Sequence, residues 1–261
     1  MKLKKSACIE TLFTELPWEK RFQAAREAGF DYVEFWNWRE KDVGRIRRLA
    51  EEAGIPISNF NGDEQFSLID PDQAGEYLAF MEQSLAVAVE LGAQALTIHS
   101  NALGEGGVVV RRYEELSDAV KLCAMFAALK ACAALAEKSG VTLNIEPLNT
   151  IADHAGNYLA GARTAAELCR RVASPRLKMV YDVYHMQLSE GNLLNNISTY
   201  FEEIGHVHVA DVPGRHEPGT GEINYPAVFR HLEGLGYSRV VGFELFPKFD
   251  TASAVKAIMS C

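Results

Sequence analysis

The sequence predicts an eight-stranded (β/α)8 barrel, the TIM-barrel architecture, and three observations point to it. The chain has 261 residues, close to the size of about 250 residues that this barrel usually has. Short β-type runs alternate with helix-type segments along the chain, which is the pattern of a parallel α/β fold. No linker, low-complexity stretch or charge block divides it, so residues 1–261 are expected to form a single domain.

The expected strands are eight short β-type runs. In chain order they are Ala7–Ile9, Tyr32–Phe35, Ile57–Phe60, Ala95–His99, Thr142–Glu146, Leu177–Asp182, His206–Ala210 and Val240–Glu244. A doubly wound open sheet is the competing topology. Eight regular units favour the closed barrel instead.

The expected helices lie between these strands and carry apolar residues at helical spacing. They are Trp18–Ala28, Asp42–Ala53, Asp72–Leu91, Arg112–Ser139, Ala162–Val172, Asn192–Phe201, Tyr225–Leu235 and Ala252–Met259. Several of them end at a glycine of the type that closes a helix C-terminus. These glycines are Gly29, Gly54, Gly92, Gly140 and Gly236.

Composition narrows the class of protein further. Apolar residues make up 48% of the chain, enough for a sizeable core. No apolar stretch is expected to reach the roughly 20 residues of a membrane span. The basic start Met1–Lys5 has no apolar segment behind it, so no secretory signal is expected. The five cysteines are odd in number and form no C-x-x-C pair, which predicts reduced thiols in a cytoplasmic protein.

The charge balance indicates the kind of partner. With 26 Lys and Arg against 35 Asp and Glu, the net charge is −9. Nucleic-acid affinity comes mainly from basic contacts to phosphate, so no nucleic-acid partner and no membrane partner is expected. A small molecule is the predicted partner, and a homo-oligomer is compatible with the chain.

Four of the expected strands deliver a metal-type ligand at or near their ends. Glu146, Asp182, His208 and Glu244 fall near the ends of the fifth, sixth, seventh and eighth strands. A charged residue at the end of a buried strand is costly unless it is paired or holds a cation. Active sites of this barrel sit at its C-terminal mouth, so these four residues are expected to converge there and hold one metal ion.

Three carboxylates and an imidazole form a hard, mostly oxygen ligand set. Such a set suits Mn²⁺ or Mg²⁺ and tolerates Co²⁺, whereas structural zinc would prefer thiolates. A metal with a neighbouring carboxylate base suits proton abstraction next to a carbonyl. No dinucleotide fingerprint, P-loop or nucleophile elbow suggests an organic cofactor.

Longer segments resemble a known family. The stretches Ile145–Thr150, Tyr181–Gln187 and above all Ala210–Tyr225 are similar to those of hydroxypyruvate isomerases, as are Leu12–Glu15, Ala24–Asp31 and Val33–Phe35. These enzymes belong to the sugar isomerase/epimerase superfamily with a xylose-isomerase-like barrel, and the resemblance covers essentially the whole chain.

The resemblance implies roles for individual residues. It implies that Glu146, Asp182 and Glu244 bind the metal, with Glu146 and Glu244 as the catalytic groups in proton transfer. It also implies that His185 binds substrate and that Arg215 lies in the loop that contacts substrate. At position 208, hydroxypyruvate isomerases tend to carry glutamine, whereas ketose 3-epimerases carry histidine.

Other residues are candidates with a simpler alternative. His99 and Glu217 are further expected substrate contacts, although His99 could equally pack in the core and Glu217 could belong to a solvated charge cluster. His206 lies on the same strand face as His208, where a satisfied core histidine is common. Glu10, Glu34 and Asn61 are candidates to line the pocket near the first three strands, and Trp36 and Trp38 to form an apolar wall.

The leading hypothesis is a metal-dependent, cofactor-independent aldose–ketose isomerase acting through an enediol with glutamate acid–base groups. Its expected substrate is a small hydroxy-oxo acid, first of all hydroxypyruvate, which would give tartronate semialdehyde. A ketose 3-epimerase and a 2-oxo-tetronate isomerase are the near alternatives. An abasic-site nuclease and a non-catalytic binding protein are more distant ones; the acidic charge argues against the first and the full ligand set against the second.

Overall fold

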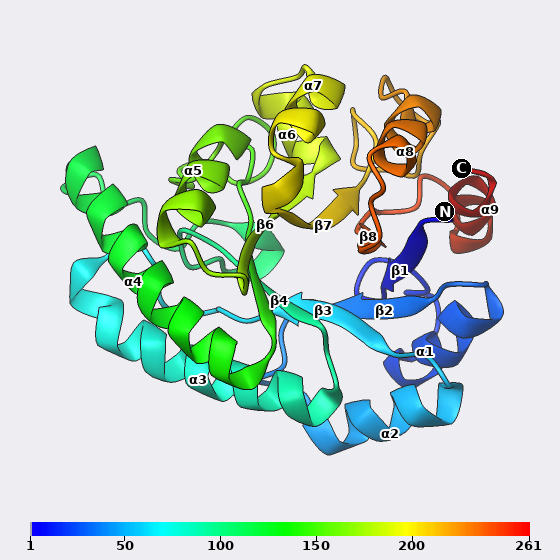
Figure 1. Ribbon diagram of the computed structural model, residues 1–261. Coiled ribbons are helices and arrows are strands. Elements are labelled where there is room, and N and C mark those ends of the chain that lie inside the picture. Colours follow the sequence, from blue (N-terminus) through cyan, green and yellow to red (C-terminus); the bar gives the residue numbers. More distant parts are fainter. Residues whose placement is uncertain (1) are drawn as a thin grey trace.

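The computed structural model describes residues 2–261 and contains a closed parallel barrel (Figure 1). Each strand pairs in parallel with the next, and the eighth pairs with the first. The predicted fold class is therefore confirmed. The strands are β1 (Lys4–Cys8), β2 (Tyr32–Phe35), β3 (Ile57–Asn61), β4 (Ala95–Ile98), β5 (Thr142–Ile145), β6 (Leu177–Asp182), β7 (Ile204–Val209) and β8 (Val240–Phe243).

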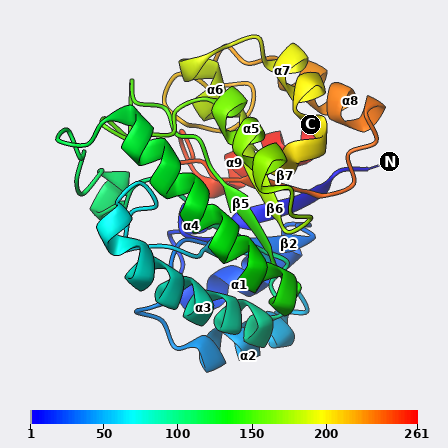
Figure 2. The ribbon, with the colours of Figure 1, turned by 60° about the vertical axis from the view of Figure 1, so that its left-hand side comes forward.

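Helices cover the outside of the barrel, and α3 and α4 run side by side along one flank (Figure 2). Short 3-10 turns lie at Pro71–Gln73, Glu105–Gly107 and Phe201–Glu203. The α-helices are α1 (Trp18–Glu27), α2 (Val43–Ala53), α3 (Ala74–Leu91), α4 (Asp118–Ser139), α5 (Ala162–Val172), α6 (Val183–Ser189), α7 (Leu193–Thr199), α8 (Tyr225–Gly234) and α9 (Thr251–Ser260).

Local capping explains two differences between the predicted helices and the structure. The helix expected from Arg112 begins only at Asp118, because the Ser117 side chain accepts a hydrogen bond from Val120 N and caps it there. Helix α6 was not predicted. It is a single short helix of 7 residues that begins directly at the end of β6, with Asp182 as its N-cap.

Helix α4 corrects one expectation from composition. By length and composition alone it is apolar enough to cross a membrane, contrary to the prediction that no stretch of the chain would be. One such helix is weak evidence for a span, because core helices of soluble proteins meet the same criterion. Here α4 packs against α3, α5 and β5 as one of the helices around the barrel, and it buries Met125, Leu129 and Cys132.

Small residues inside the barrel determine which larger side chains fit. A Cβ atom on Gly205 of β7 would lie 1.9 Å from Asn144 Oδ1, and one on Gly242 of β8 would lie 2.3 Å from Glu34 Oε1. Real side chains do not approach this closely, so both positions need glycine for space. The barrel interior is therefore a packed layer that includes polar side chains rather than an open pore.

Candidate active site at the C-terminal mouth

The four predicted ligand residues come together at the C-terminal end of the barrel. Asp182 is the last residue of β6 and pairs in register with His208 of β7, while Glu146 and Glu244 directly follow β5 and β8. His208 Nδ1 lies 3.0 Å from Glu146 Oε1 and 4.0 Å from Asp182 Oδ2. Ligand atoms of Asp182, His208 and Glu244 all lie within 4.8 Å of one another. Except for the partly buried Glu244, all are buried.

Asp182 serves two purposes with its two oxygens. Oδ1 accepts hydrogen bonds from Tyr184 N at 2.7 Å and His185 N at 3.1 Å, and it thereby caps α6. Oδ2 is left facing the site, 4.0 Å from His208 Nδ1 and 3.5 Å from His185 Nε2. Capping of α6 and a place at the site are therefore compatible for Asp182.

Glu146 lies between two imidazoles. Oε1 is 3.0 Å from His208 Nδ1, and Oε2 is 3.4 Å from His99 Nε2. Burial raises the pKa of the Glu146 carboxyl, but the charges and hydrogen bonds of His208 and His99 outweigh burial and hold the pKa well below its usual range. Glu146 is therefore ionised and able to accept a proton from a reacting group.

His99 is held by a carboxylate that sequence reasoning did not single out. Its Nδ1 is 2.9 Å from Asp63 Oδ1, and its backbone N donates to Asp63 Oδ2 at 2.6 Å. Burial lowers the pKa of the imidazole, but Asp63 and Glu146 together raise it to about 10. Asp63 follows β3 by two residues, and its position just past a strand end was the only signal that could have identified it.

Glu244 is fixed from both sides. Trp36 Nε1 donates to its Oε1 at 2.7 Å, and Arg215 Nη2 pairs with its Oε2. The Arg215 guanidinium also lies over the ring of Tyr184, 5.4 Å from the centroid. Trp36 thus contributes a hydrogen-bond donor at the mouth in addition to the apolar wall expected from the sequence.

His185 lies in the first turn of α6 and is fully buried. Its Nδ1 is 2.6 Å from Asn149 Nδ2, so the amide donates and Nδ1 accepts. This arrangement leaves the Nε2 hydrogen for the site, 3.5 Å from Asp182 Oδ2. Burial, followed by the charge of Arg215, lowers the pKa of His185 well below its ordinary value, so this imidazole is neutral.

The loop after β7 is organised by Asp211. Its carboxylate accepts hydrogen bonds from four backbone amides of the loop, those of Val212, Gly219, Gly221 and Ile223. This frame places Arg215 against Glu244. Glu217 is buried and accepts a hydrogen bond from Lys248 N at 2.9 Å, which ties the β7 loop to the loop after β8. Contact of Glu217 with a substrate stays a prediction.

The donor set fits a divalent cation. Its three carboxylates and one imidazole are the ligand types that Mn²⁺ and Mg²⁺ accept. Burial, followed by the charge of Glu146, raises the pKa of Asp182 to about 7. The crowding of buried acids therefore disfavours the ionised form of one of them, and a cation at this point would relieve that cost.

The fold and the site together define a (β/α)8-barrel protein with a buried carboxylate–imidazole centre at its C-terminal mouth. The xylose isomerase-like TIM barrel family matches residues 22–261, and the chain belongs to this family. The family resemblance expected from the sequence is therefore confirmed.

Similar proteins cover nearly the whole chain. The hydroxypyruvate isomerase of Escherichia coli is 29% identical over 97% of this chain and 97% of its own length. A 2-oxo-tetronate isomerase of Cupriavidus necator is 28% identical over 96% of this chain and 95% of its own. Among solved structures, one titled AP endonuclease, family 2, from Brucella melitensis has a TM-score of 0.86 and 28% identity, covering 99% of both chains.

Proposed function

We propose that this protein is a divalent-cation-dependent aldose–ketose isomerase for a small hydroxy-oxo acid, with hydroxypyruvate as the first candidate substrate. The observation that carries the proposal is the order of groups around the mouth. Glu146 and Glu244 follow β5 and β8, and the ligand pair Asp182 and His208 lies on the two strands between them. Two carboxylates separated by a cation site are the groups that a proton transfer between adjacent carbons requires.

Glu146, Asp182, His208 and Glu244 would hold Mn²⁺ or Mg²⁺, with Co²⁺ as a tolerated substitute. The bound cation would polarise the substrate carbonyl and stabilise the negative charge that develops on its oxygen.

The glutamates carry the proton transfer. One carboxylate removes a proton from the hydroxyl-bearing carbon, which gives an enediol, and a proton is returned to the neighbouring carbon. The hydroxyl proton moves to the former carbonyl oxygen, so the product is an isomer and no other reactant is consumed. The lowered pKa of Glu146 keeps its carboxylate ionised, as a general base must be, and general-base catalysis contributes about 10²–10⁴-fold.

Substrate contacts follow from the remaining groups at the mouth. The Nε2 of His185 and the Arg215 guanidinium offer donors to a substrate hydroxyl and carboxylate. His99 contacts Glu146 directly, so its place in the site is at least to orient this carboxylate.

One observation favours a second function. Histidine at position 208 is the residue that the resemblance associates with ketose 3-epimerases, in which two glutamates would act on opposite faces of a neutral ketose. A 2-oxo-tetronate isomerase has the same chemistry as the first proposal with a longer acid, and a relative of that name supports it. Nuclease activity is not carried over from the Brucella melitensis structure, because the net charge of −9 opposes a polyanion.

The test is a substrate screen in D₂O followed by NMR. Hydroxypyruvate, tartronate semialdehyde, four-carbon oxo acids and free ketoses are each incubated with enzyme that has been stripped of metal and reloaded with Mn²⁺ or Mg²⁺. Isomerisation of an oxo acid with deuterium at the reacting carbon is expected only in the reloaded enzyme. Turnover that is unchanged by chelation, or product without deuterium, would contradict the proposed chemistry, and a preference for ketoses would favour the epimerase.

A further inference from the structure

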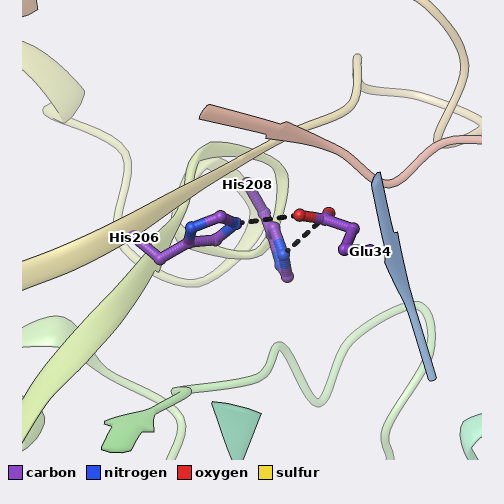
Figure 3. Close-up of side chains that lie close together, drawn as sticks. All are labelled: Glu34, His206 and His208. Atoms are coloured by element: carbon purple, nitrogen blue, oxygen red, sulfur yellow. Dashed lines mark ion pairs between the residues drawn. The ribbon is translucent and has the colours of Figure 1, made fainter. Parts of the chain in front are cut away.

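A buried carboxylate lies directly beneath the ligand His208. Glu34 of β2 reaches across the barrel to two imidazoles of β7, as Figure 3 shows. Its Oε1 is 3.3 Å from His208 Nε2 and its Oε2 is 3.2 Å from His206 Nε2. All three side chains are at most 4% exposed. The contact therefore joins the interior of the barrel to the site at its mouth.

The two nitrogens of His208 face different groups. Nδ1 is directed at Glu146 and Asp182, on the side where a cation would be held, while Nε2 is directed at Glu34. A neutral imidazole has one N–H and one lone pair, and the nitrogen that ligates a cation must carry the lone pair. An ionised carboxylate only accepts hydrogen bonds, so Glu34 favours the hydrogen on Nε2.

The chain leaves space for this contact. A Cβ on Gly242 would lie 2.3 Å and 2.6 Å from the two Glu34 oxygens and 2.7 Å from His206 Nε2. Only a residue without a side chain between β2 and β7 lets Glu34 reach His208. On the other side, Ser58 Oγ donates to Glu34 Oε2 at 3.3 Å and is itself 2.8 Å from Ser6 Oγ.

We propose that Glu34 is a positioning residue that fixes the orientation and tautomer of His208, with His206 holding the second oxygen of the same carboxylate. The inference rests on the proposed cation site. Carboxylates that accept a hydrogen bond from a metal-ligating histidine orient the ring and increase its basicity. His206 is then a part of this support, which distinguishes it from the satisfied core histidine considered from the sequence.

The same three residues also have the composition of a second cation site. For such a site, His208 would give both nitrogens to cations and would lose its only N–H. Glu34 lies at ion-pair distance from each imidazole, 3.2 Å and 3.3 Å, so the three groups can offset one another's charge without an ion. The charge pairing therefore favours a support for His208 over a second cation site, and the number of bound cations distinguishes the two arrangements.

The first experiment measures Mn²⁺ binding by the EPR signal of the free ion. Wild type is expected to bind one Mn²⁺. Glu34→Gln should weaken binding by roughly 10- to 100-fold, the usual effect of removing such a partner, because the amide has one accepting oxygen for two imidazoles. Ser58→Ala is the matched control, since it removes a hydrogen bond to the same carboxylate at the same depth without touching His208; less than about a twofold change is expected. Far-UV circular dichroism confirms that each variant is folded.

The second experiment needs no variant of Glu34. In the Mg²⁺-loaded wild type, ¹⁵N NMR of labelled histidine should show the His208 ring with Nε2 protonated and Nδ1 unprotonated, assigned by its loss in His208→Gln. The opposite tautomer, equal Mn²⁺ affinity in wild type and Glu34→Gln, or two bound ions would each overturn the inference. Absence of Mn²⁺ binding by the wild type would instead contradict the proposed function.

Discussion

The two ends of the barrel carry charges of opposite sign, and these charges differ in how far they are exposed to water. At the C-terminal mouth, three carboxylates and several histidines are buried or partly buried and lie within a few ångströms of one another. At the N-terminal end, a cavity of about 380 Å³ is lined by Lys4, Arg176, Lys178 and Arg239. Lys4 and Arg239 are exposed there, and Arg176 and Lys178 are partly exposed.

The difference is a matter of hydration. Cations that stay in contact with water cost little and need no partner; Lys178 Nζ simply donates to Glu202 O at 2.8 Å. Buried carboxylates lose their hydration and are costly unless hydrogen bonds, opposite charges or a cation compensate. The hollow at the N-terminal end is therefore a weaker indication of function than the crowded mouth.

The largest expected effect is on kcat, and it distinguishes variants at the mouth from a variant at the N-terminal end. Glu146→Gln and Glu244→Gln should each lower kcat by about 10²-fold or more, because each removes a group that accepts a proton. Arg176→Gln, at the opposite end, should leave kcat within about twofold of the wild type. Steady-state kinetics on the substrate found in the screen measure all three. Loss of activity in Arg176→Gln with the glutamate variants still active would reverse the comparison.

The sequence was sufficient to predict the mouth but not its support. Strand periodicity and spacing identified Glu146, Asp182, His208 and Glu244, because residues at the ends of successive parallel strands must meet at one end of a barrel. Asp63 is a lone acid in a loop, and nothing in its local pattern shows that it pairs with His99. Such pairings depend on which side chains face each other across the barrel.

Local hydrogen bonds limited the prediction in the same way. Helix α6 was missed because its start depends on one oxygen of Asp182, a residue already assigned to a strand end. Glu34 was only one of several candidates near the first strands. Its contact with His208 requires the empty position at Gly242 on another strand, which no local pattern reveals.

A smaller effect is expected from the residue that closes the mouth. Arg215 pairs with Glu244 and is only partly exposed. Arg215→Ala should lower kcat/KM by roughly 10- to 150-fold, which corresponds to about 1.5–3 kcal/mol for a charge-assisted hydrogen bond. Arg215→Lys keeps the charge but loses the planar fork, so KM for an acid substrate should rise more than KM for a neutral ketose. If both variants process the acid as well as the wild type, Arg215 does not recognise a carboxylate.

The smallest expected effect concerns stability against pH and again contrasts the two ends. The pKa of His99 is raised to about 10 in the folded protein by Asp63 and Glu146, whereas an unfolded histidine titrates near about 6.5. Between these values the folded state holds one more proton than the unfolded state, so the contribution of His99 is fully present below about pH 6.5 and is lost as pH rises through about 10. In metal-free protein, the free energy of unfolding from urea titrations should therefore fall more steeply between pH 7 and pH 10 for the wild type than for His99→Gln. A difference of at least about 1 kcal/mol is expected, since one pKa unit corresponds to about 1.4 kcal/mol.

Arg176→Gln is the control for this measurement. Its unfolding free energy should follow the wild-type slope, because the guanidinium of Arg176 does not titrate in this range. Parallel slopes for wild type and His99→Gln would show that His99 is not charged in the folded protein.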